Sequence, residues 1–168
     1  MLKQKSSVRS FFVYRDVVME KILISSCLFG LPVRYDGKSQ ALLHPQINVW
    51  RKENRLVMFC PEVAGGLPTP RASAEIKQGR VVTSTYEDVT KEFKSGAAKA
   101  LDLCNEHAIR FALLKESSPS CGRNTIYDGS HSGVKVQGMG MTAKLLMEHQ
   151  IEVFSENQIP ALIKVLAL

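Results

Sequence analysis

Short apolar runs alternate with amphipathic segments along the whole chain. The runs are rich in Ile, Leu, Val and Phe, end at Gly, Pro, Ser or Cys, and cover residues 22–26, 56–59, 109–115 and 151–154. Their length and composition predict β-strands. Because the runs are apolar on consecutive positions, they are typical of strands covered on both faces, as in a parallel sheet.

The clearest helical pattern lies between residues 88 and 107, where Val89, Phe93, Ala97, Leu101 and Cys104 recur at helical spacing and charged residues face away. We therefore expect Cys104 in the core rather than at a functional site. Shorter helices are predicted at 44–53, 141–149 and 156–165, a hairpin at 74–85 and a long glycine-punctuated loop at 125–141.

This alternation predicts an α/β protein with a single-domain, Rossmann-like three-layer fold and a mainly parallel sheet. A length of 168 residues suits one domain. Residues 1–18 carry four basic residues against Asp16 alone, which is also compatible with an import presequence, and Met19 is a second candidate start. We therefore predict a dispensable extension at 1–18 and the functional domain at 19–168.

Composition and charge narrow the classes of function. The chain is 45% hydrophobic, carries a net charge of +6, and shows no cluster of Lys and Arg interleaved with aromatic residues, so nucleic-acid binding is not favoured. No apolar run approaches the roughly 18 residues that a membrane span needs. Four cysteines without a secretory signal favour a cytoplasmic protein. The oligomeric state stays open.

Three cysteines, Cys27, Cys60 and Cys121, follow predicted strands directly, in loops rich in Gly, Pro, Ser and Arg. The carboxyl ends of parallel strands meet at one edge of a sheet, so these thiols could converge there. Zinc is disfavoured because structural zinc sites use closely spaced ligand pairs, which the sequence lacks. The open interpretations are an iron–sulfur cluster with one free coordination position, a nucleophilic thiol, and buried thiols without chemistry.

Polar neighbours of the cysteines are candidates for supporting roles. Glu62 lies two positions after Cys60 and could accept a proton. Ser120, and after it Ser118, could donate hydrogen bonds to a substrate oxygen or a cluster sulfide.

Charged residues in the same loop regions complete the candidate set. Arg34, Arg71 and Arg123 could offset the negative charge of a cluster or contact substrate. Asp36 is a second-rank acid or base, for which a structural role in the Tyr35–Asp36–Gly37 turn is favoured.

Three segments, CLFGLPVRYDG (27–37), FCPEVAGGLPTPR (59–71) and LLKESSPSCG (113–122), resemble the thiouracil desulfidase (TudS-like) family of bacteria, long catalogued as a domain of unknown function. The later segments GVKVQGMGMTAKLL and IEVFSENQI are also similar, and the resemblance covers residues 21–160. Residues 1–18 fall outside it, and Ala72–Ser73 stands where the family has a proline-rich stretch.

The resemblance implies a [4Fe–4S] cluster on Cys27, Cys60 and Cys121, with an open iron that binds substrate sulfur. It implies non-redox hydrolysis of a small thiolated nucleobase, in which 2-thiouracil and water give uracil and hydrogen sulfide. Glu62 would activate water or pass a proton to the ring, and Ser120, or after it Ser118, would orient the base or the developing oxygen. Two alternatives stay open: a sulfur-transfer or tRNA-modifying enzyme that uses the same cluster, and a non-catalytic metal-binding sensor.

Overall fold

The computed structural model describes residues 18–168, and the prediction of a dispensable extension at 1–18 lies outside them apart from Val18. Four parallel strands form the central sheet in the order β2-β1-β5-β8. They are β1 (Ile22–Ser25), β2 (Leu56–Phe59), β5 (Phe111–Leu114) and β8 (Glu152–Ser155). The predicted α/β class and parallel sheet are thus confirmed.

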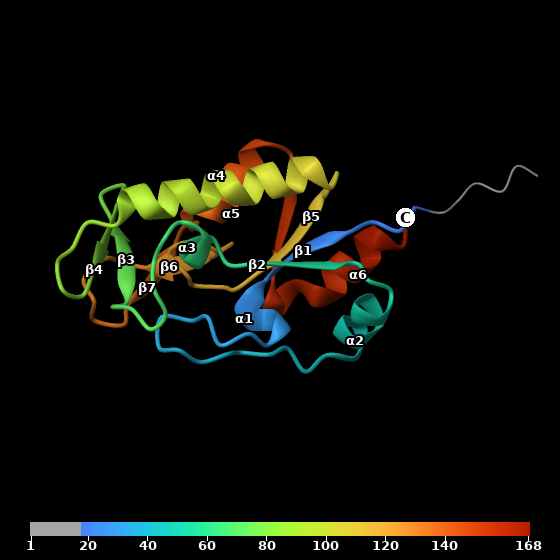
Figure 1. Ribbon diagram of the computed structural model, residues 1–168, viewed down its shortest axis with the longest axis horizontal. Coiled ribbons are helices and arrows are strands. Elements are labelled where there is room, and N and C mark those ends of the chain that lie inside the picture. Colours follow the sequence, from blue (N-terminus) through green and yellow to red (C-terminus); the bar gives the residue numbers. More distant parts are fainter. Residues whose placement is uncertain (1–17) are drawn as a thin grey trace, which may run out of the picture.

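Helices cover both faces of the sheet and make it the middle of three layers (Figure 1). One layer holds α4 (Thr90–Glu106) and α5 (Met141–Glu148). The opposite layer holds α1 (Ser26–Phe29), α2 (Pro45–Lys52) and α6 (Ile159–Leu166), the last preceded by a 3-10 turn, η1 (Glu156–Gln158). No helix among residues 18–168 is long and apolar enough to cross a membrane.

Alternating side chains on the strands divide the core in two. In β1, Leu23 packs in the cluster that holds Cys104 of α4 and Leu146 of α5, whereas Ile22 and Ile24 pack in the cluster on the other face. Every residue of β1 and β5 is buried, as expected for strands in the middle of a parallel sheet. The prediction that Cys104 is a core residue is confirmed, because it is 1% exposed.

Two small antiparallel hairpins lie together at one end of the molecule (Figure 1). The first, β3 (Ala74–Lys77) with β4 (Arg80–Thr83), was expected from the sequence. The second, β6 (Thr125–Tyr127) with β7 (Lys135–Gln137), corrects the prediction of an unstructured loop at 125–141. Strands this short carry no readable periodicity, and their pairing depends on contacts with the first hairpin, where Glu75 accepts a hydrogen bond from the Gly129 amide at 3.0 Å.

Candidate metal centre and its cavity

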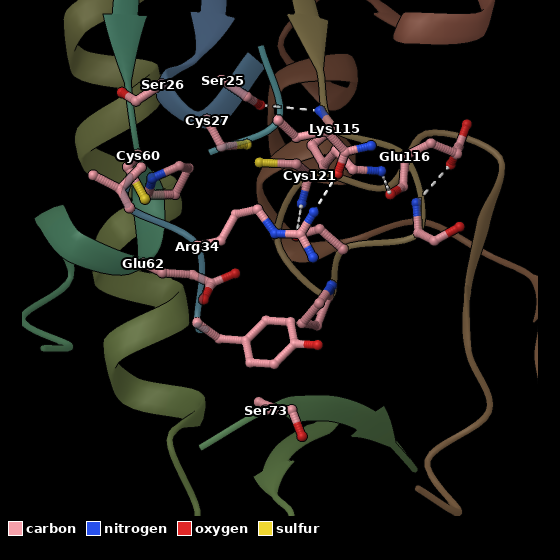
Figure 2. Close-up of a pocket in the computed structure, with 18 of the residues that line it drawn as sticks. Ser25, Ser26, Cys27, Arg34, Cys60, Glu62, Ser73, Lys115, Glu116 and Cys121 are labelled. Carbon is pink, nitrogen blue, oxygen red and sulfur yellow. Dashed lines mark hydrogen bonds between the residues drawn. The ribbon is translucent and has the colours of Figure 1, made fainter. Parts of the chain in front are cut away.

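A cavity of about 390 Å³ opens at the carboxyl edge of the sheet, and three thiols line it (Figure 2). Cys27 lies in α1 after β1, Cys60 follows β2, and Cys121 lies in the turn after β5. These strands are neighbours in the sheet, which brings the three loops together. Cys27 and Cys60 are partly buried and Cys121 is buried, and all three are free thiols.

Cys60 is held in place by the close crossing of two helices. It precedes α3 (Pro61–Ala64), whose first residue Pro61 lies against α4 at Gly96. A Cβ built on Gly96 would stand 1.9 Å from the Pro61 carbonyl oxygen, so only glycine allows α4 to pass this close. The long helix therefore sets the position of the Cys60 loop.

Cys121 is held by a tight turn with a side-chain cap. The Ser118 hydroxyl accepts hydrogen bonds from the backbone amides of Ser120 at 3.1 Å and Cys121 at 3.0 Å. The start of α5 packs directly on this turn, since a Cβ on Gly140 would lie 2.5 Å from the Ser120 carbonyl oxygen. Ser118 lines the cavity while it shapes the turn that carries the thiol.

A single carboxylate, that of Glu116, closes the loop around Cys121. Its Oε1 accepts hydrogen bonds from backbone amides, and its Oε2 accepts one from the Asn124 side chain at 2.9 Å. The amide donors are those of Ser117, Arg123, Asn124 and Thr125, at 3.2, 2.9, 3.0 and 3.1 Å. Glu116 therefore holds together the loop that carries Cys121.

The three thiols line one cavity, and their burial disfavours the thiolate form of each. Burial raises the pKa of Cys27 to about 11, with a further increase from Cys60. Burial also raises the pKa of Cys60 and of Cys121, and the pKa of Cys121 is raised further by Cys27 and Cys60. Metal binding requires thiolates, so a metal or cluster that binds here must displace these protons.

Glu62 reaches the same cavity from α3 and is ion-paired with Arg71. The Arg71 Nε donates to Glu62 Oε2 at 2.8 Å, and the same guanidinium donates to the Val33 carbonyl oxygen at 3.1 Å. Within residues 18–168, Glu62 Oε1 has no hydrogen-bond partner. The carboxylate is thus held by one oxygen, and the other is free to take a proton.

Three residues singled out in the sequence do not line this cavity. Ser120 is completely buried, and its hydroxyl pairs with that of Thr142 at 2.8 Å. Arg123 points toward the edge strand, where its Nε donates to the Val153 carbonyl oxygen at 3.0 Å. Asp36 caps its own turn and forms an ion pair with Arg34 at 3.4 Å.

Three cations line the cavity besides Arg71, namely Arg34, Lys115 and Lys135, the last of which lies over the Tyr127 ring. Arg34 was expected there and is hydrogen-bonded to Gln40. Lys115 was missed by sequence reasoning, and it forms a 2.7 Å ion pair with Glu156. Its position directly after the strand that leads to Cys121 was the available signal, because residues at that edge face the site.

Comparisons with known proteins identify the family of the chain. Residues 22–158 match the family model described as 2-thiouracil desulfurase. The uncharacterized protein YbbK of Bacillus subtilis (strain 168) is 43% identical over 148 residues, covering 82% of this chain and 97% of that protein. A solved structure described as the [4Fe–4S]-dependent thiouracil desulfidase TudS has a TM-score of 0.87 and 53% identity, covering 88% of this chain and 98% of that one. The chain therefore belongs to the 2-thiouracil desulfurase family.

Proposed function

We propose that the cavity is the active site of a [4Fe–4S]-dependent desulfidase that hydrolyses thiouracil or a related thiolated base. Water and 2-thiouracil would give uracil and hydrogen sulfide, without a change of oxidation state. The observation that carries the proposal is the meeting of Cys27, Cys60 and Cys121 in one cavity, from three strand ends, in a chain of this family. The solved relative described as a [4Fe–4S]-dependent thiouracil desulfidase supports the cofactor and the substrate class.

The donor set fits a cluster better than a single ion. Within residues 18–168, no group of three His, Cys, Asp or Glu side chains is close enough to bind one metal ion. A cluster differs, because each thiolate binds its own iron and the thiols are spread around it. Held by these three thiolates, a [4Fe–4S] cluster would supply one iron without a protein ligand as a Lewis acid toward the substrate sulfur.

Glu62 is the proposed general base. Its free Oε1 would accept a proton from the water molecule that attacks the ring carbon bonded to sulfur. The new bond joins that carbon to the water oxygen, and the bond that breaks joins it to sulfur, which leaves as HS⁻ with the second proton. Arg71 keeps the carboxylate in place through Oε2 and leaves Oε1 unbound within the described part of the chain.

Ser118 is the proposed hydroxyl for orienting the base. It lines the cavity, and it accepts from the Ser120 and Cys121 amides, so its own O–H is available as a donor. Ser120, the first choice from the sequence, is fully buried against Thr142 and is assigned here to the packing of α5. Arg34 stays a candidate for substrate contact, since it lines the cavity.

Anaerobic reconstitution with iron and sulfide, followed by a sulfide-release assay on 2-thiouracil, tests the proposal. We expect the wild-type chain to bind iron and release sulfide without a reductant. Cys27→Ser, Cys60→Ser and Cys121→Ser should each lose the cluster, whereas the matched control Cys104→Ala should keep it. Glu62→Gln should keep iron and lose turnover. The proposal is wrong if the wild type binds no iron, or if the three serine variants release sulfide at the wild-type rate.

A further inference from the structure

The ammonium group of Lys115 is fixed in the wall of the cavity. Its Nζ donates to the Glu116 carbonyl oxygen at 2.9 Å and to Glu156 Oε1 at 2.7 Å. The third N–H has no hydrogen-bond partner within residues 18–168, and the side chain is 23% exposed. A lysine side chain has several rotatable bonds, so two bonds of this kind are what hold its charge at one place.

Glu156 supplies this anchor from the neighbouring strand. It follows β8, and its Oε2 accepts a 2.7 Å hydrogen bond from the Glu116 amide, so the carboxylate joins the ends of β5 and β8. Glu156 does not line the cavity, whereas Lys115 does. The ion pair therefore fixes the charge of Lys115 in the wall of the cavity that the three thiols also line.

Lys115 is one of four cations that line the cavity, and its carboxylate partner, Glu156, lies outside the lining. Lys135 is exposed and lies over the Tyr127 ring. Arg71 is paired within the cavity with Glu62, and Arg34 is occupied by Asp36 and Gln40. Figure 2 shows Lys115 on the same side of the cavity as Cys27 and Cys121.

We propose that Lys115, positioned by Glu156, is a fixed cation that stabilises the negative charge of the three-cysteine site when it holds its cluster. The inference rests on the proposed function, because it assumes a cluster on Cys27, Cys60 and Cys121. Three thiolates bring three negative charges into a largely buried cavity, and such charge is costly unless a nearby opposite charge offsets it. The sequence pointed to Arg34, Arg71 and Arg123 for this role, of which Arg34 and Arg71 line the cavity with Lys115.

The reduction potential of the reconstituted cluster is the decisive measurement. A nearby cation favours the reduced, more negative cluster, so Lys115→Met should move the potential to more negative values. It should also release iron to a chelator roughly tenfold faster, the factor that corresponds to about 1.4 kcal/mol. Lys115→Arg should keep both values near those of the wild type. Lys164→Met, which removes an exposed lysine of α6, is the matched control and should change neither.

The direction in which a second variant shifts the reduction potential distinguishes an effect of charge from an effect of packing. Glu156→Gln removes the negative charge behind Lys115 and should move the potential to more positive values. If the lysine and glutamate only supported the fold, both variants would disturb the site in the same direction. A shift of the same sign in both, or an unmoved potential in Lys115→Met, overturns the inference and leaves the desulfidase proposal intact. A wild-type chain that binds no iron overturns both.

Discussion

Replacing Glu116 by glutamine tests how the Cys121 loop is held together. The wild-type carboxylate accepts six hydrogen bonds. The donors are the backbone amides of Ser117, Arg123, Asn124 and Thr125, the Asn124 side chain and the Thr125 hydroxyl. Glutamine keeps the shape but loses the charge. Its NH₂ group would also face either a backbone amide or the Asn124 amide group, so one donor would meet another donor.

The size of the effect follows from the titration of the carboxyl group. Burial alone would raise the pKa of Glu116, but the backbone amides of Asn124 and Thr125 and the Asn124 side chain lower it from 4.5 to about 2. Such a shift corresponds to about 3 kcal/mol of folding free energy near neutral pH. Because solvent close to the site screens the charge, we expect a smaller contribution to the folding free energy, about 2 kcal/mol.

Urea unfolding of the wild type and Glu116→Gln across pH is the assay. A depressed folded pKa stabilises the protein above the unfolded value of 4.5, and this contribution is lost as pH falls toward about 2. The difference between the two proteins should therefore be about 2 kcal/mol near pH 7 and less than half of that at about pH 3. Glu87→Gln, at an exposed turn, is the control. A difference that does not change with pH would refute the role of the charge.

Three further substitutions test the residues that hold the cysteines in place. Gly96→Ala would place a methyl group against the Pro61 carbonyl oxygen. We expect it to lower the free energy of unfolding by about 1–3 kcal/mol, measured by heat or urea, and to weaken iron retention. Unchanged stability would show that α3 and α4 can move apart without cost. Ser120→Ala should cost about 1 kcal/mol through loss of the Thr142 hydrogen bond and keep its turnover per cluster, whereas Ser118→Ala should lower turnover. If Ser120→Ala slowed sulfide release and Ser118→Ala did not, Ser120 would be the residue that orients the substrate.

Local patterns in the sequence were sufficient to predict the central fold. Helical spacing predicted α4 and the burial of Cys104, and continuous apolar runs predicted strands buried on both faces. The hairpin β6–β7 was missed because each strand has three residues and its pairing depends on distant contacts. The bounds of α1 and α3 were missed for a similar reason, since each is a single turn within a loop.

The site was predicted only in part, because the sequence does not show in which direction a side chain points. The strand ends placed the cysteines at one edge, and Glu62 lines the cavity with them as expected. Adjacency to a cysteine, however, does not decide where a side chain points. Ser120 and Arg123 both neighbour Cys121 and both turn away from the cavity, toward Thr142 and Val153. Lys115 was overlooked because its role depends on Glu156, which is distant in sequence.

The placement of the three cysteines on separate strands bears on when metal can enter the protein. In an unfolded chain, Cys27 and Cys60 are separated by α2 and β2, and Cys121 follows only after both hairpin β3–β4 and α4. Loops of such length bring their ends together rarely, whereas closely spaced ligand pairs can bind metal as the chain folds. We therefore expect iron to bind only after the central sheet has formed. In a chain that is still being synthesised the three thiols are far apart, and a single thiol binds zinc or copper ions weakly.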